Sequence, residues 1–261
     1  MKETRKMKRH TLLILIALAS VFTIGAKAQP TAEQWFEQAN KAYNAGSYDT
    51  ALVLYKNVID NELESVSLYF NMGNTYYKMR EYPLAVYYYE KALKLDPSND
   101  DVRTNLAIAN LAIVDKIEEV PQSFIVKGWY GLRHSLSGQQ WTLLSIMAFA
   151  LLLVSAFLFL RARRMGLRKL GFFVGLAMLV VLALSVLFAS QQKQAALKED
   201  QAIVMTPTVT VKSTPNEASV DLFVLHEGTK VQILDHADGW NKIRIANGSI
   251  GWLQAETMLP F

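Results

Sequence analysis

The segment VSLYFNMGNTYYKMREYPLAVYYYEKALKLDPSN at residues 66–99 carries the pattern that decides the fold of the N-terminal half. Its small and aromatic residues recur 34 positions earlier. The pairs are Trp35 and Tyr69, Ala39 and Gly73, Tyr48 and Tyr82, Ala51 and Ala85, and Tyr55 and Tyr89. Small residues let two helices approach closely, aromatic residues fill the space beside them, and proline ends a helix. A period of 34 residues therefore predicts two helix pairs, at residues 32–65 and 66–99.

This repeat resembles the tetratricopeptide (TPR) family. The second copy matches it best, with Gly73, Tyr76, Ala85, Tyr89, Ala92 and Pro97 at the family's small, aromatic and proline positions. The first copy is looser, with Ala39, Ala42, Val58 and Leu63 at the corresponding places. Residues 100–117 continue as an amphipathic pattern, and we expect one cap helix there because stacked repeats need a polar end. The resemblance implies an all-α TPR solenoid over residues 29–117.

In TPR folds the first helix of each repeat lines a concave groove that receives extended peptides. Carried over position by position, the groove residues are Phe36, Asn40, Tyr43, Phe70, Asn71, Asn74, Tyr77 and Asn105. Asparagine offers a donor and an acceptor, and aromatic rings offer flat apolar area. A carboxylate-binding clamp is not expected, since two of its basic positions hold Phe36 and Asp101. The alternative is that the aromatic residues only stabilise the packing between helices.

Two apolar stretches, residues 141–160 and 170–190, contain no charged residue, and each is long enough to cross a bilayer core of about 30 Å. The nine residues between them, 161–169, carry five positive charges and no acid, which is typical of a short cytoplasmic loop. Neither stretch holds an ionisable side chain, so we expect an anchoring hairpin rather than a transport pathway. Gly171 and Gly175 are expected to pack against the partner span, with dimerisation as the alternative.

Residues 1–28 have the composition of a secretory signal peptide. A basic start precedes an apolar stretch at 11–25, and Ala26-Lys27-Ala28 supplies a small-x-small cleavage site. An uncleaved signal anchor is the alternative. In both interpretations the chain after residue 28 is exported across the membrane. The predicted cytoplasmic location of the basic loop agrees with this. We therefore expect a protein of the inner (cytoplasmic) membrane, with periplasmic N- and C-terminal domains and a cytoplasmic loop at 161–169.

Charge and composition exclude several classes of function. Residues 1–28 hold six basic residues and one acidic residue, so the rest has 21 basic and 22 acidic residues, a net charge of −1. A nucleic-acid partner is therefore not expected. The chain has no cysteine, which excludes disulfides and thiol catalysis. It also lacks phosphate-loop, nucleophile-elbow and zinc-protease motifs, and we expect no enzyme activity, metal or cofactor.

The C-terminal third begins with a polar linker at 191–201 and continues as short alternating strands at 202–261. Asp238-Gly239 and Asn247-Gly248 are hairpin turn signals. This pattern resembles the bacterial SH3-like (SH3b) domain, which implies a small all-β barrel. Trp240 and Trp252 are candidates for a ligand face, although we expect at least one of them in the core. The segment at 118–140, rich in aromatic residues, is expected to lie in the lipid headgroup layer or to pack against the repeat cap.

The order of these parts describes a multidomain membrane protein. It resembles the BatE proteins of the Bacteroides aerotolerance (Bat) operons. That resemblance implies a non-catalytic scaffold for membrane and periplasmic proteins in a stress-tolerance complex. Its partners would include von Willebrand A-domain proteins and a MoxR-type AAA+ ATPase. The alternative is an envelope anchor that binds peptidoglycan through the SH3b domain.

Overall fold

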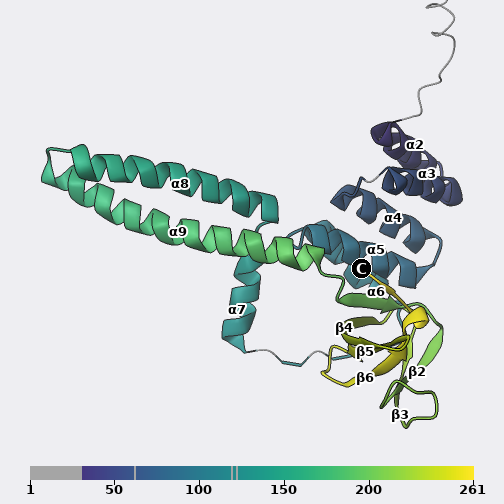
Figure 1. The fold of residues 1–261 in the computed structure, drawn as a ribbon. Helices are drawn as coiled ribbons and strands as arrows, with labels where there is room; N and C mark the ends of the chain where they lie inside the picture. Colours follow the sequence, from purple (N-terminus) through teal and green to yellow (C-terminus); the bar gives the residue numbers. More distant parts are fainter. Residues whose placement is uncertain (1–30, 62, 119, 122) are drawn as a thin grey trace, which may run out of the picture.

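A computed structural model describes residues 31–61, 63–118, 120–121 and 123–261. The predicted signal peptide at 1–28 lies outside the described residues. The described chain forms a helical array, a long helical hairpin and a β-sheet, and the sheet lies against the far end of the array (Figure 1).

The array consists of two antiparallel helix pairs and one further helix. They are α2 (Ala32–Asn44), α3 (Tyr48–Asp60), α4 (Val66–Lys78), α5 (Tyr82–Leu95) and α6 (Asp100–Asn110). The pairs α2–α3 and α4–α5 fall within the two predicted repeats. Thr31, Ser65 and Asn99 begin α2, α4 and α6, each accepting a hydrogen bond from a backbone N–H of the first turn.

The small residues of the repeat permit the helix packing that the sequence predicted. A Cβ atom added at Gly73 of α4 would lie 2.6 Å from two ring carbons of Tyr89 on α5. Ala39, Ala51 and Ala85 are completely buried. The aromatic ring of one helix therefore occupies the space that a larger residue on the other helix would need.

The predicted cap helix at 100–117 is too long. Helix α6 ends at Asn110, because Lys116 folds back and its Nζ donates to the carbonyl oxygens of Asn110 and Ile113, both at 2.7 Å. This turn satisfies carbonyl groups that the helix would otherwise have paired. It also brings Asp115 to the β-sheet, a contact that a continuing helix could not make.

Helices α8 (Gly138–Arg161) and α9 (Met165–Leu197) form the hairpin, and both are long and apolar enough to cross a membrane. The turn between them is shorter than predicted, because Arg168 and Lys169 already belong to α9. The predicted linker at 191–201 is mostly helix, since its Gln, Lys and Ala residues are good helix formers that extend α9 to Leu197.

The glycines of the hairpin face its other arm. A Cβ atom at Gly171 would lie 2.8 Å from the carbonyl oxygen of Ser155 and from the amide nitrogen of Phe159, both on α8. Gly175 faces the Ser155 side chain, with its added Cβ 3.4 Å from that residue's Cβ. The expected packing against the partner arm is confirmed.

The C-terminal domain is a seven-stranded antiparallel sheet in the order β3-β2-β6-β5-β4-β1-β7. Its strands are β1 (Gln201–Val204), β2 (Thr208–Lys212), β3 (Asp221–His226), β4 (Lys230–Ala237), β5 (Trp240–Arg244), β6 (Ile250–Gln254) and β7 (Met258–Pro260). A single 3-10 turn, η1 (Ala255–Thr257), precedes β7. The predicted turn at Asp238-Gly239 forms a two-residue hairpin with positive φ at both positions, 47° and 81°. At Asn247-Gly248 a hairpin also forms, but its loop is longer, closed by a hydrogen bond from Ile245 N–H to the Ser249 carbonyl.

The C-terminal domain is all-β as predicted, but its sheet is not a closed barrel. The end strands β3 and β7 do not pair with each other within the described residues, so the sheet stays open. Strand β7 lies against the helical array instead. The Tyr87 hydroxyl of α5 donates to the Pro260 carbonyl oxygen at 3.3 Å, and the Phe261 ring packs edge-on against Tyr87 with centroids 5.7 Å apart. The edge that would close a barrel is therefore used to contact α5.

Contacts between the helical array and the sheet, here called the docking interface, combine apolar and polar groups. Ile203 and Phe261 are buried in the hydrophobic core of the helical array. The Asp115 carboxylate accepts hydrogen bonds from the His226 N–H, the His226 ring Nδ1 and the Thr229 hydroxyl, each at 2.7 Å. The Lys230 ammonium pairs with Glu90 at 2.7 Å. Each domain has its own core, and Ile203 and Phe261 of the C-terminal domain extend the core of the helical array across the interface.

Candidate functional site

The first helices of the repeats carry a chain of side-chain hydrogen bonds along their inner face. In the first repeat the Asn40 Oδ1 accepts from the Tyr55 hydroxyl at 2.7 Å and from the Asn71 Nδ2 at 2.8 Å. Asn40 lies on α2, Tyr55 on α3 and Asn71 on α4, so these bonds join three consecutive helices. The asparagine positions carried over from the family are therefore brought together.

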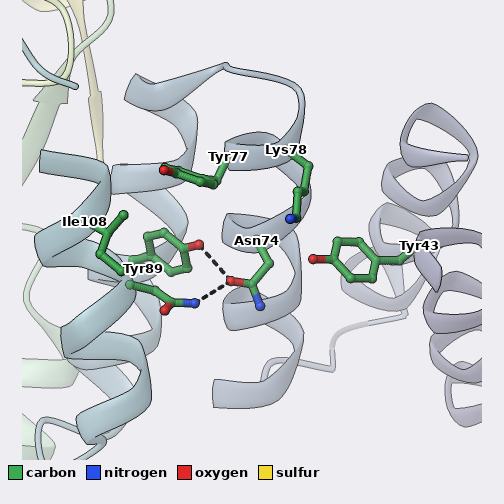
Figure 2. Close-up of a pocket in the computed structure, with 7 residues that line it drawn as sticks. Tyr43, Asn74, Tyr77, Lys78, Tyr89 and Ile108 are labelled. Atoms are coloured by element: carbon green, nitrogen blue, oxygen red, sulfur yellow. Dashed lines mark hydrogen bonds between the residues drawn. The ribbon is translucent and has the colours of Figure 1, made fainter. Parts of the chain in front are cut away.

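The same arrangement recurs 34 residues later. The Asn74 Oδ1 accepts from the Tyr89 hydroxyl at 2.7 Å and from the Asn105 Nδ2 at 2.8 Å, as the dashed lines in Figure 2 show. Sequence reasoning missed the role of the two tyrosine hydroxyls. The signal for it was present, since Tyr55 and Tyr89 are themselves 34 residues apart.

These bonds determine which amide groups remain available to a ligand. Both donors reach the oxygen of Asn40 and of Asn74, so the Nδ2 groups of these residues make no hydrogen bond to protein within the described residues. Asn71 and Asn105 use their Nδ2 groups, and their Oδ1 atoms are likewise unused there. The inner face therefore offers donors and acceptors in alternation, the two kinds of group that pair with an extended peptide backbone.

A cavity of about 290 Å³ opens beside the second network, between α2, α4, α5 and α6. Its lining is Tyr43, Asn74, Tyr77, Lys78, Tyr89, Asn105 and Ile108. In Figure 2 Tyr43 extends from the neighbouring repeat with its hydroxyl directed toward Asn74. Four of the predicted groove residues, Tyr43, Asn74, Tyr77 and Asn105, line this cavity, whereas Lys78, Tyr89 and Ile108 were not predicted.

The two predicted phenylalanines do not line the cavity. Phe36 packs against Tyr55 with ring centroids 6.0 Å apart, and Phe70 packs against Tyr89 at 6.1 Å. Both are partly buried against the core of the helical array. They support the tyrosines whose hydroxyls orient Asn40 and Asn74, so their contribution to this surface is through packing.

The tyrosines of the network remain neutral at physiological pH. Burial raises the pKa of Tyr55 to about 12, against a smaller opposing effect of its hydrogen bond with the Asn71 amide. Burial also raises the pKa of Tyr89. Because a neutral phenol keeps its proton, both hydroxyls continue to donate to the asparagine oxygens across the physiological range.

Trp240 and Trp252 lie on the outer face of the sheet. They alternate along β5 and β6 with the buried residues Asn241, Ile243 and Leu253. Neither tryptophan belongs to the sheet's hydrophobic core, so the expectation that at least one would do so is wrong. The Lys242 ammonium lies 5.9 Å from the Trp252 ring centroid and covers part of that ring.

Comparison with known proteins gives a match over the best-defined repeat. The tetratricopeptide repeat family model matches residues 66–99, the second predicted repeat. A human protein, tetratricopeptide repeat protein 6, is 38% identical over 65 residues, which is 25% of this chain. The match spans 12% of that human protein's length.

Proposed function

Starting from a tetratricopeptide repeat at residues 66–99, we propose that the chain is a non-catalytic scaffold that holds partner proteins at a membrane. TPR repeats are modules of protein–protein interaction, and the two apolar helices are long enough to anchor the chain. Partner proteins would bind along the inner face of α2, α4 and α6 as extended segments.

The observation that carries this proposal is the repeated asparagine–tyrosine network. It leaves the Nδ2 groups of Asn40 and Asn74 and the Oδ1 groups of Asn71 and Asn105 unused, and it does so twice at the same spacing. Asn74 and Asn105 line the cavity, where their unused amide groups are open to pair with the backbone of a ligand. Tyr43 and Tyr77, beside the network, supply apolar area for anchor side chains.

For location, we propose the inner membrane with α8 and α9 as spans and both folded domains in the periplasm. The positive charges around the hairpin turn favour a cytoplasmic turn. The resemblance to BatE proteins further suggests that the scaffold acts in a Bat-type aerotolerance complex. Its partners would then be von Willebrand A-domain proteins and a MoxR-type AAA+ ATPase.

The test is site-specific photo-crosslinking of the full-length protein in its native membrane. A photoreactive phenylalanine analogue replaces Ile108, an exposed residue that lines the cavity. The matched control places the same analogue at Val53, which is exposed on α3 and does not line the cavity. We expect a discrete crosslinked protein from position 108 and none from position 53. Mass spectrometry of the crosslinked peptide identifies the partner.

A second pair of variants tests whether the cavity contributes affinity. Ile108→Arg introduces a bulky cation into the cavity, and Val53→Arg adds the same group elsewhere on the array. Co-purification of the crosslinked partner should be lost with Ile108→Arg and retained with Val53→Arg. Equal crosslinking from both positions, or equal retention in both variants, would contradict binding at this surface.

A second candidate function is peptidoglycan binding through the C-terminal sheet, which the half-buried tryptophans on its outer face favour. Trp240 and Trp252 flank Lys242 on one face of β5 and β6, an arrangement suited to a polar ligand stacked on aromatic rings. Purified peptidoglycan should then sediment the full-length protein, and a Trp240→Ala/Trp252→Ala double variant should stay in solution. Sedimentation that is equal for both forms would exclude these tryptophans as the binding surface.

A further inference from the structure

A second, separate cavity of about 210 Å³ lies where α5, α9, the sheet and the C-terminal end of α7 (Phe124–Arg133) meet. The polar part of its lining includes Glu90, Lys94, Arg133, His134, Gln192 and Lys230. None of these residues belongs to the groove network described above. Three cations and one carboxylate give this lining a net charge of +2, counting His134 as neutral.

The charges of this cavity are only partly balanced by protein groups. Lys230 pairs with Glu90 at 2.7 Å. Lys94 and Arg133, by contrast, have no carboxylate within 4.0 Å among the described residues. Two unpaired cations that share one small cavity repel each other, and a bound anion would relieve that repulsion.

Lys94 is partly desolvated, and the acidic groups that act on it lie outside the cavity lining. Burial lowers the pKa of Lys94, while Glu199 and Asp200 act on it in the opposite direction from outside the cavity lining. The Arg133 guanidinium donates to His134 Nε2, at 2.8 Å from Nη2 and 3.2 Å from Nε. Burial, together with the charges of Arg133 and Arg103, lowers the pKa of His134. Arg133 therefore binds a neutral imidazole where a carboxylate would be the stronger partner.

Hydrogen bonds from the base of the hairpin fix the position of this cavity. Gln192 of α9, 6% exposed, donates through Nε2 to the carbonyl oxygens of Arg133 at 2.6 Å and Leu136 at 2.9 Å. The Trp141 Nε1 of α8 donates to the same Arg133 carbonyl at 3.0 Å. Gln192 lies two residues after Ser190, the last residue of the apolar stretch of α9. These bonds therefore hold the cavity close to the end of that stretch.

Helix α7 indicates the level of the bilayer surface. It runs across the axis of the hairpin at the hairpin's open end (Figure 1). Its Trp129 ring packs on Phe188 of α9 with centroids 5.0 Å apart, and no residue of α7 is buried. Phe124 and Ile125 are 84% and 67% exposed. A helix with apolar exposed side chains, tryptophan and flanking cations has the composition of a helix in the headgroup layer.

We propose that this cavity binds the phosphate of an anionic phospholipid headgroup, with Lys94 and Arg133 as its principal ligands. The proposal rests on the membrane insertion of α8 and α9 that the proposed function includes. A bound phosphate would compete with the neutral His134 ring for the Arg133 fork, which matches two phosphate oxygens, and the lysine supplies a point charge. His134 and Lys230 also line the cavity, and Glu90, its one carboxylate, is paired with Lys230. The bound lipid would fix the depth of the docked domains above the membrane.

The experiment measures lipid binding to purified full-length protein in nanodiscs. Thermal stability is followed while phosphatidylglycerol replaces phosphatidylcholine at constant total lipid, and bound lipid is counted by native mass spectrometry. The double variant Lys94→Gln/Arg133→Gln is compared with Lys127→Gln, which removes one cation from α7 outside the cavity lining. We expect the double variant to lose affinity for phosphatidylglycerol about tenfold or more, and Lys127→Gln less than about twofold.

Three results would overturn the proposal. Equal losses in the double variant and in Lys127→Gln would assign the effect to general surface charge. Saturating inorganic phosphate that stabilises the protein as well as phosphatidylglycerol, and displaces it, would assign the cavity to a soluble anion. Unchanged lipid binding in the folded double variant would remove the site. Arg133→Lys provides a second, conservative variant, which keeps the charge, loses the fork and should bind with intermediate affinity.

Failure of this proposal is distinguishable from failure of the scaffold. Crosslinking from position 108 reports on the groove alone, and resistance to alkaline carbonate extraction reports on membrane insertion alone. A protein that crosslinks its partner and resists extraction, but binds no anionic lipid, would keep the proposed function and contradict only the lipid site.

Discussion

The docking interface should depend strongly on Asp115, and its replacement gives a quantitative test. The carboxylate accepts three hydrogen bonds from His226 and Thr229, each at 2.7 Å, and its side chain is 14% exposed. Hydrogen bonds to charged groups contribute about 1.5–3 kcal/mol each. They are not additive here, and the His226 side chain is 34% exposed, so we expect a total of about 3 kcal/mol for Asp115→Ala.

Asp115→Asn is the informative comparison. Its oxygen can still accept from the His226 N–H and the Thr229 hydroxyl, and its amide can donate to a neutral His226 ring. We expect a loss of only about 1 kcal/mol for this variant. Unfolding of the full-length protein in mild detergent should then begin about 6–12 °C lower for Asp115→Ala and about 2–4 °C lower for Asp115→Asn.

A control substitution and a local measurement in the same sheet test whether the effect is specific to Asp115. Asp221→Ala removes a carboxylate that is 67% exposed and paired with Lys212, and an exposed pair contributes about 0–1 kcal/mol. Hydrogen exchange at the His226 amide should accelerate in Asp115→Ala and stay unchanged in Asp221→Ala. If Asp115→Ala shifted the transition no more than Asp221→Ala does, Asp115 would not hold the domains together.

Acidification should weaken the same contact. Burial opposes ionisation, but hydrogen bonds from the His226 N–H, the Thr229 hydroxyl and the His226 ring together hold the pKa of Asp115 below its ordinary value of 3.8. A carboxylate with a lowered folded-state pKa stabilises fully above its ordinary pKa and loses that contribution as the pH falls through the lowered value. Stability of the wild type should therefore fall below about pH 4 with a component that Asp115→Asn lacks.

Four further substitutions test the packing. Gly73→Val should destabilise the repeat by about 1–3 kcal/mol, because its Cβ would lie 2.6 Å from the Tyr89 ring, and a lowered midpoint of thermal unfolding measures the loss. Gly171→Ala should destabilise the hairpin and increase its proteolysis, whereas Gly175→Ala should be nearly neutral, since only the first new Cβ meets backbone of α8 at 2.8 Å. Phe261→Ala, at a 5% exposed position, should cost about 3–5 kcal/mol, and wild-type stability in that variant would show that Phe261 does not hold the sheet on α5.

Local periodicity made the helical array and the hairpin predictable. The 34-residue recurrence identifies both helix pairs, and Gly73 and Tyr89 meet as the pattern requires. The apolar stretches at 141–160 and 170–190 coincide with the central parts of α8 and α9. Each of these features depends on a pattern of residue types that is visible along the chain itself. The sequence alone therefore predicts them.

Contacts between distant segments were not predictable in the same way. Asp115 and His226 are 111 positions apart, and neither belongs to a repeat, so nothing local indicates that they meet. The cap helix was predicted too long because the amphipathic pattern continues past Asn110 and gives no sign of the turn that Lys116 stabilises. The open sheet was not anticipated, because β7 gives no local sign that it contacts Tyr87. The tyrosine hydroxyls were overlooked because aromatic periodicity was interpreted as packing alone.

The docking interface also has a consequence for biosynthesis. The ribosome makes α5 and Asp115 before the hairpin, and makes Ile203 and Phe261 after it. Until the last strand is synthesised, the apolar surface around Tyr87 on α5 has no cover from β7 and Phe261. This apolar patch therefore stays exposed on the nascent helical array while more than 140 further residues, from Asp115 to Phe261, are synthesised. Truncated translation products of this protein should accordingly be substrates for holding chaperones, and the completed chain should not.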